Sequence, residues 1–375
     1  MKWGKRMTAI ICAGMAMSGC TESFWRETTP PGGIAELIRE EEERQAEEPS
    51  ISVSLPQNSN SEVSEESEIS QQTQEESLSV SARQESLYSY DRMMEELRQL
   101  EKTYPQWIDL DSIGNSVQGR EIPLVLLGNG SQEVLYIAAI HGCEFSTVNY
   151  IMRCLREYAQ AADQGEDYGS YDIAGILSKY TLYIVPMANP DGFEISNQQA
   201  EPDFICEELE AVRAEYSTNA NGVNLNRNFP FEWEKALGSD QHEYSAAKGT
   251  EPGSEPETKA LMALCKERDF IQMFSFHNYG YCIYWRDEIN GEIEGDERLL
   301  GLLWANCGFY GQDVTSEPDG YAGGFENWFR SQFSKPGLCI ELGLTQYAPS
   351  EYMEQFETAI AWEQTRLCML QGLSE

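Results

Sequence analysis

Large hydrophobic residues are sparse over residues 21–85 and follow two regular spacings from about residue 86 onward. Helical spacing, with apolar residues three or four positions apart, predicts helices over 90–104, 147–162, 256–268, 299–307 and 352–370. In the first of them the apolar stripe comprises Met93, Met94, Leu97 and Leu100. Ser89, just before this helix, is a suitable N-cap because its hydroxyl can accept a backbone N–H of the first turn.

Short apolar runs between these helices predict strands over 122–127, 134–140, 180–187, 270–276 and 338–342. The turn Gly128-Asn129-Gly130 separates the first two. Strands that alternate with amphipathic helices indicate a single α/β domain over 86–375. In such domains the functional side chains gather just beyond the ends of the strands.

Residues 21–85 differ from the rest of the chain in composition, because they are rich in Glu, Ser and Gln and poor in large hydrophobic residues. Such a segment cannot bury enough apolar area to offset the entropy lost on ordering. We therefore expect a disordered, acidic tether, which charge repulsion keeps extended.

Residues 1–20 have the pattern of a bacterial export signal. Basic residues at Lys2, Lys5 and Arg6 precede an apolar run over 7–17 that is too short for a mature membrane-spanning helix. Ser18-Gly19-Cys20 then resembles a lipobox, in which Cys20 is the lipidated first residue of the mature chain. We expect an extracytoplasmic lipoprotein anchored to the cell membrane, with plain secretion as the alternative.

Charge and cysteine content narrow the function classes further. With 63 acidic and 26 basic residues, the net charge of −37 disfavours nucleic acid or an anionic membrane surface as a partner. The ten cysteines form no Cys-x-x-Cys pair, which disfavours a zinc ribbon or a thioredoxin-like site. We expect the cysteines beyond the leader to be mainly small buried hydrophobic residues, although one or more disulfides are an alternative. We expect the protein to be a monomer.

The chain has only three histidines, His141, His242 and His277. His141 follows the predicted strand 134–140 and begins His141-Gly142-Cys143-Glu144, and His277 directly follows the strand 270–276. Two imidazoles and one carboxylate would leave a fourth position open for water, as in catalytic rather than structural zinc sites. The alternative is a pair of unrelated histidines at strand ends.

Further motifs follow in a fixed order: Asn189-Pro190-Asp191-Gly192, the stretch 222–230 (GVNLNRNFP), Ser254-Glu255-Pro256-Glu257-Thr258, Gly323-Gly324-Phe325 and Cys339-Ile340-Glu341-Leu342-Gly343. Together with the histidine segments they resemble the zinc carboxypeptidase family, which contains carboxypeptidases A and B, over about 86–373. The Ile-Glu-Leu-Gly ending looks closer to the bacterial cell-wall peptidases of that family. The resemblance implies a mixed, twisted central sheet flanked by helices on both faces, and one zinc ion per chain.

The resemblance also implies roles for single residues. His141, Glu144 and His277 match the zinc ligands, and Glu341 matches the general base that takes the water proton and passes it to the leaving amine. The alternative for Glu341 is a solvated strand-end carboxylate.

On the substrate side, Asn226 and Arg227 match the pair that grips a terminal carboxylate, since a guanidinium fork can bind both oxygens. An internal salt bridge is the alternative for Arg227. Tyr321 corresponds to the mobile tyrosine that closes over substrate, and Asp319 competes for that alignment.

Three positions depart from the family pattern. Asn224 stands where the family has an aspartate that orients the first zinc histidine, so this contact carries no charge. Cys143 stands where digestive members have an arginine. The arginine that stabilises the oxyanion has no obvious match, and Arg213, the only arginine between Asp191 and Arg227, is the candidate for that role.

These residues predict a zinc-dependent metallopeptidase that hydrolyses bonds at or near a free carboxylate end. Its substrates would be extracellular peptides or peptidoglycan stem peptides cleaved at the γ-D-glutamyl–diamino acid bond. One alternative is a catalytically weakened protein that binds peptides or wall fragments, motivated by Asn224 and the missing arginine. Another is a zinc amidase or deacylase acting on small acyl-amino acids.

The residue released is predicted from Glu326, two positions after Gly324. In the family this position lies at the base of the pocket for the leaving residue. An enclosed carboxylate would favour a lysine, an arginine or the free amino end of a diamino acid. The alternative is that Glu326 faces solvent.

Overall fold

A computed structural model describes residues 88–204, 206, 209–236, 238, 247–278, 280–314, 318–343, 362 and 365–373. The expected signal peptide and tether lie outside the described residues, as do His242 and most of the helix predicted over 352–370. The end of that predicted helix is described, and it is the short 3₁₀ turn η4 (Cys368–Leu370).

The described residues form one mixed sheet of eight strands in the order β1-β2-β4-β3-β5-β8-β6-β7. In chain order the strands are β1 (Ile108–Asn115), β2 (Glu121–Leu127), β3 (Gln132–Ala138), β4 (Tyr180–Val185), β5 (Phe270–His277), β6 (Cys282–Tyr284), β7 (Tyr310–Gln312) and β8 (Gly337–Glu341). The central strands β4, β3, β5 and β8 are parallel to their neighbours within this group, while β1, β2 and β6 introduce antiparallel pairs.

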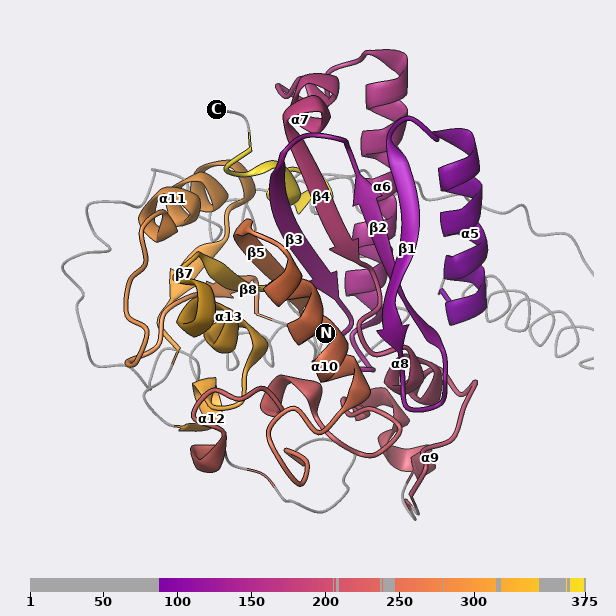
Figure 1. The fold of residues 1–375 in the computed structure, drawn as a ribbon, viewed down its shortest axis with the longest axis vertical. Helices are drawn as coiled ribbons and strands as arrows, with labels where there is room; N and C mark the ends of the chain where they lie inside the picture. The colour runs from indigo at the N-terminus through magenta and orange to yellow at the C-terminus, as the bar shows by residue number, and fades with distance from the viewer. Residues whose placement is uncertain are drawn as a thin grey trace, which may run out of the picture. The chain divides into compact units, whose positions relative to one another are not determined.

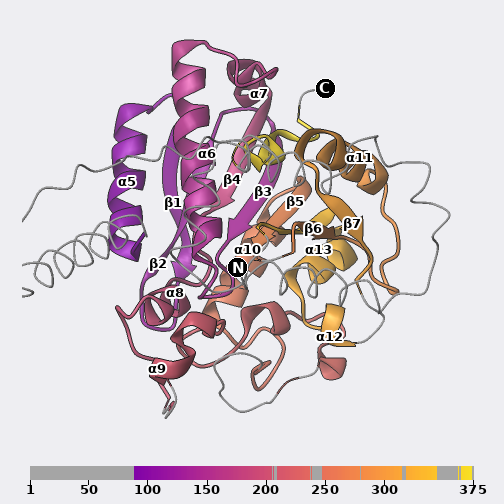
Figure 2. The same ribbon diagram turned by 180° about the vertical axis from the view of Figure 1, so that it is seen from behind.

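Helices cover both faces of this sheet, as Figures 1 and 2 show from opposite sides. One face carries α5 (Tyr90–Thr103), α6 (Phe145–Gln164), α7 (Ile173–Lys179) and α11 (Asp296–Cys307), and the other carries α10 (Pro256–Glu267) and α13 (Phe325–Phe333). The shorter helices are α8 (Pro190–Ser196), α9 (Leu209–Val212) and α12 (Pro318–Tyr321). The 3₁₀ turns η1 (Arg213–Glu215), η2 (Leu225–Arg227) and η3 (Trp233–Lys235) lie in the long connection between β4 and β5. The predicted fold class is confirmed.

Two hydrophobic cores explain why the central strands are apolar throughout. On β3, Val134 and Tyr136 belong to the core under α5 and α6, whereas Leu135 and Ile137 belong to the core under α10 and α13. Successive side chains of a strand point to opposite faces, so a strand covered on both sides needs hydrophobic residues at every position.

The predicted strands and helices up to residue 342 are present, with ends shifted by a few residues, and Ser89 caps α5 by accepting the N–H of Arg92 at 3.3 Å. The strands β1, β6 and β7 were not predicted. The first lies at the sheet edge, with half of its residues exposed, and the other two have three residues each, too few to show a period.

Cysteines 143, 154, 265, 282, 307 and 368 are buried, and the described part of the chain contains no disulfide. Among the same residues, no helix combines the length and the apolar character needed to cross a membrane.

Candidate metal centre

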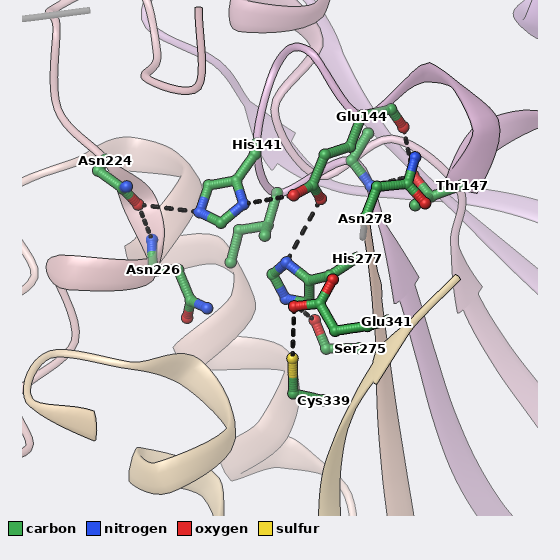
Figure 3. A network of polar contacts seen from close by, with 12 residues as sticks. His141, Glu144, Thr147, Asn224, Asn226, Ser275, His277, Asn278, Cys339 and Glu341 are labelled. Carbon is green, nitrogen blue, oxygen red and sulfur yellow. Dashed lines mark hydrogen bonds and ion pairs between the residues drawn. The ribbon is translucent and has the colours of Figure 1, made fainter. Parts of the chain in front are cut away.

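Three neighbouring parallel strands end together and carry the expected chemistry at their carboxyl ends. Along this edge His277, the last residue of β5, is paired with Glu341, the last residue of β8. On the other side of β5, Phe276 is paired with Ala138 at the end of β3, and His141 follows three residues later. The register of the sheet therefore brings residues from distant parts of the sequence to one place, as Figure 3 shows.

The loop that carries His141 is held by the motif at Asn189, for which the sequence suggested no role. Asn189 caps α8 by accepting the N–H of Gly192, and its amide donates to the carbonyl oxygen of Ile140, directly before His141. Gly142 is packed so closely that a Cβ there would lie 2.4 Å from the backbone of Gly192. Only glycine permits this approach of the two loops.

His141, Glu144 and His277 converge on one point (Figure 3). Glu144 Oε1 lies 2.8 Å from His141 Nδ1, and Glu144 Oε2 lies 3.3 Å from His277 Nδ1. One potential ligand atom from each residue falls within 4.8 Å of the others. The structure thus brings together the three residues that the sequence proposed as zinc ligands.

The outer nitrogens of the two rings have their own partners. His141 Nε2 lies 3.2 Å from Asn224 Oδ1, and His277 Nε2 lies 3.0 Å from Glu326 Oε1 and 2.9 Å from Ser275 Oγ. Each Nε2 therefore lies beside an acceptor, and Nδ1 of both imidazoles faces the shared space beside Glu144, where it would bind a metal ion.

The chemistry of this donor set fits zinc. Burial alone would raise the pKa of Glu144, but the nearby imidazoles of His141 and His277 outweigh it and lower the pKa to about 2. Glu144 Oε2 is buried, and its 3.3 Å contact with His277 Nδ1 is an ion pair rather than a hydrogen bond, so this oxygen has no hydrogen-bond partner among the described residues. Two imidazoles and an ionised carboxylate with an unsatisfied oxygen match the three-ligand catalytic sites of zinc enzymes.

Glu341 lies beside this cluster. Burial is the main cause that raises its pKa, to about 8, and the negative charges of Glu144 and Glu326 add to it while His277 opposes it. Its Oε2 atom is buried without a hydrogen-bond partner in the described part of the chain. Its other oxygen, Oε1, accepts from Cys339 Sγ at 3.8 Å. A carboxylate with a raised pKa and one buried oxygen without a partner is suited to exchange a proton with a bound molecule, and the general-base role of Glu341 stays a prediction.

The residues expected to bind substrate lie on and around the turn η2. The amide group of Asn226 donates to Glu326 Oε2 at 3.3 Å and accepts the N–H of Phe325 at 2.7 Å, so its orientation is fixed. Arg227 follows it and donates to the Asn226 carbonyl at 2.8 Å. Gly323 packs against this turn so tightly that a Cβ would lie 2.2 Å from the Arg227 carbonyl oxygen. The Gly-Gly motif thus supports the turn.

Two other expected site residues have different surroundings. The guanidinium of Arg213 makes five hydrogen bonds, to Glu201, to Glu210 twice and to the carbonyls of Ile195 and Ala200. These use all five of its N–H groups, so the oxyanion role stays a prediction that this arrangement does not support. Tyr321 is buried against Phe231 and donates to Glu288 at 3.0 Å, and its closure over substrate also remains a prediction.

Glu326 is buried beside the metal site. The alternative that it faces solvent is wrong, since it is only 5% exposed and contacts His277. Burial would raise its pKa, but the hydrogen bond and the charge of His277 lower it to about 2. The contact of Ser275 with His277 could have been found, because residues two apart on a strand share a face. The contact of Glu326 spans 49 positions and has no local signal.

Comparison with known proteins agrees with this geometry. The family model described as zinc carboxypeptidase matches residues 93–297. The γ-D-glutamyl-L-diamino acid endopeptidase 1 of Lysinibacillus sphaericus is 29% identical over 265 residues, which cover 68% of this chain and 65% of the relative, just under two thirds of its length. Carboxypeptidase B of Astacus astacus is 29% identical over 59% of this chain and 71% of its own.

Solved structures share the fold. The crystal structure of carboxypeptidase A from Helicoverpa armigera superposes with a TM-score of 0.58 at 17% identity, over 76% of this chain and 73% of that one. At this identity the likeness concerns the architecture alone.

Proposed function

The chain belongs to the zinc carboxypeptidase family and is a zinc-dependent metallopeptidase, and we propose that it cleaves the γ-D-glutamyl–diamino acid bond of peptidoglycan stem peptides. The observation that carries the proposal is the meeting of His141, Glu144 and His277 beside Glu341, whose Oε2 atom is buried without a hydrogen-bond partner among the described residues. The named activity of the Lysinibacillus relative supports this choice of bond over others.

Each residue contributes a separate part of the chemistry. His141, Glu144 and His277 would hold the zinc ion, which lowers the pKa of a bound water and polarises a carbonyl group. Glu341 would take a proton from the attacking water and return it to the leaving amine. Arg227, on the turn η2 beside Asn226, would bind a substrate carboxylate through its planar guanidinium.

We also propose that the protein works outside the cytoplasm, held at the membrane by lipid on Cys20. The basic start, the short apolar run and Ser18-Gly19-Cys20 support this location. An extended acidic tether over 21–85 would give the catalytic domain reach into the wall, where stem peptides are found.

The test is incubation of the zinc-loaded protein with a defined panel of muropeptides, read by mass spectrometry. The panel should contain tripeptide and tetrapeptide stems with a diamino acid, the same stems with an apolar residue in its place, and ordinary peptides with free carboxyl ends. Cleavage between D-glutamate and the diamino acid, absent in Glu341→Gln, supports the proposal. Release of single C-terminal residues from ordinary peptides alone would instead identify a carboxypeptidase.

A protein that binds stem peptides without cleaving any member of the panel would be a binding protein. Isothermal titration of the same muropeptides against wild type and Glu341→Gln separates this outcome from inactivity. Binding without turnover in the zinc-loaded wild type would reject the catalytic proposal.

A further inference from the structure

The two zinc histidines are supported by groups of different charge. His141 Nε2 contacts the amide oxygen of Asn224 at 3.2 Å, and His277 Nε2 contacts the carboxylate of Glu326 at 3.0 Å. A carboxylate behind a metal-binding imidazole fixes its tautomer and ring orientation and increases the basicity of the ligand nitrogen. An amide oxygen fixes the tautomer but supplies no charge.

A continuous hydrogen-bonded chain connects these two outer contacts. Asn224 Oδ1 also accepts the N–H of Asn226 at 2.9 Å, and the amide of Asn226 donates to Glu326 Oε2 at 3.3 Å. The chain therefore runs from His141 through Asn224, Asn226 and Glu326 to His277. It joins both imidazoles through the turn that also carries Arg227.

Glu326 has no oxygen left without a partner in this arrangement. Oε1 accepts from His277, Oε2 accepts from Asn226, and the residue is 5% exposed. Both oxygens are thus directed at His277 and Asn226, and burial leaves little of the carboxylate open to the basic side chain of a leaving residue.

We propose that Glu326 is a positioning residue for His277 and supplies to the zinc site the negative charge that Asn224 does not provide to His141. Glu326 thereby acts through the metal ligand rather than as the base of the pocket for the leaving residue. The inference needs the zinc site but is independent of the substrate proposed above.

The central experiment measures zinc affinity of the metal-free full chain by competition with a chromophoric chelator, so no substrate is involved. Glu326→Gln should weaken zinc binding about 10–100-fold, the usual effect of losing such an outer contact. Ser275→Ala is the matched control, because it removes a neutral partner from the same His277 nitrogen. It should change the affinity by no more than about threefold.

Moving the charge distinguishes positioning from a general loss of structure. Adding Asn224→Asp to Glu326→Gln places a carboxylate behind His141 instead, and should restore affinity to within about threefold of wild type. A lost packing contact at Glu326 would not be repaired from Asn224. The visible spectrum of the cobalt-substituted proteins should change in Glu326→Gln and return toward wild type in the double variant.

Several results would overturn the inference. One is wild-type zinc affinity in Glu326→Gln together with a switch in preference from basic to apolar leaving residues, which would establish the pocket role. Another is weak binding that Asn224→Asp does not repair. A third is two zinc ions per chain in wild type and one in Glu326→Gln, because His277, Glu326 and Cys339 also lie within 4.8 Å of one another and would then form a second site.

If Glu326→Gln does not fold, Asn224→Asp alone decides the question. A second carboxylate in the wild-type background should tighten zinc binding at least about threefold if charge behind the imidazoles controls affinity. Unchanged affinity in that variant would reject the proposal.

Discussion

At the scale of single residues, one carboxylate organises the metal centre. Glu144 faces the Nδ1 atoms of both His141 and His277, and its own Oε2 lacks a hydrogen bond among the described residues. In the absence of a cation this buried oxygen is costly, so the arrangement favours a bound metal over an empty site.

The first prediction concerns the two histidines. His141→Ala and His277→Ala should each abolish zinc retention, since two remaining protein ligands hold the ion too weakly. Metal analysis of the purified proteins checks this, with His242→Ala as the control that should keep one zinc ion per chain. Stoichiometric zinc in either of the first two variants would contradict the ligand assignment.

The second prediction concerns Glu341, which lies beside the ligands but is not one of the three. Glu341→Gln should retain zinc and lower kcat/KM about 10²–10⁴-fold, because an amide cannot carry the proton. Zinc content and turnover of the best muropeptide are measured on the same sample. Activity within about tenfold of wild type would remove Glu341 from its role.

At the scale of elements, the position of α13 decides much of the site, because Glu326 is in its first turn and the Gly-Gly motif precedes it. A buried ion pair holds this helix to α11. Arg330 donates to both oxygens of Asp296, at 2.9 and 2.8 Å, and both side chains are completely buried. Arg330 also donates to the Gly291 carbonyl at 2.6 Å, which connects α13 to the loop before α11.

The third prediction concerns this buried ion pair between Arg330 and Asp296. Arg330→Ala leaves the Asp296 carboxylate buried without its partner and should lower the free energy of unfolding by about 3–5 kcal/mol. Urea denaturation of the zinc-loaded proteins provides the measurement. Arg286→Ala is the control, because its pair with Asp313 is exposed and should cost no more than about 1 kcal/mol. An equal decrease in the free energy of unfolding in the two variants would show that the buried ion pair stabilises the fold no more than the exposed one.

At the scale of the whole molecule, the proposed lipid anchor and tether decide where the catalytic domain acts. The fourth prediction is that Cys20→Ala moves the protein from the membrane fraction to the soluble fraction, because the acceptor of the lipid is lost. Cys12→Ala, within the apolar run of the leader, should leave the distribution unchanged. Immunoblots of fractionated cells compare the two, and membrane retention of Cys20→Ala would reject the lipoprotein.

The sequence by itself was sufficient to predict the fold class and to select the three residues that the structure brings together at the candidate metal site. Alternating strand and helix periods predicted an α/β domain, because burial on both faces requires continuous apolar strands. His141 and His277 were found because strand ends can be located from local pattern, and the order of the family motifs then identified Glu144 and Glu341.

Only the tertiary structure decided what supports those ligands. Glu326 meets His277 across 49 positions and Asn226 across 100, so no local period reports these contacts. Arg213 was considered for the oxyanion role because of its place in the order of motifs. In the structure it instead pairs with Glu201 and Glu210, which lie in the same connection between β4 and β5. Periodicity records which face of an element is buried, whereas the direction of a polar side chain depends on how α13 and η2 pack beside the sheet.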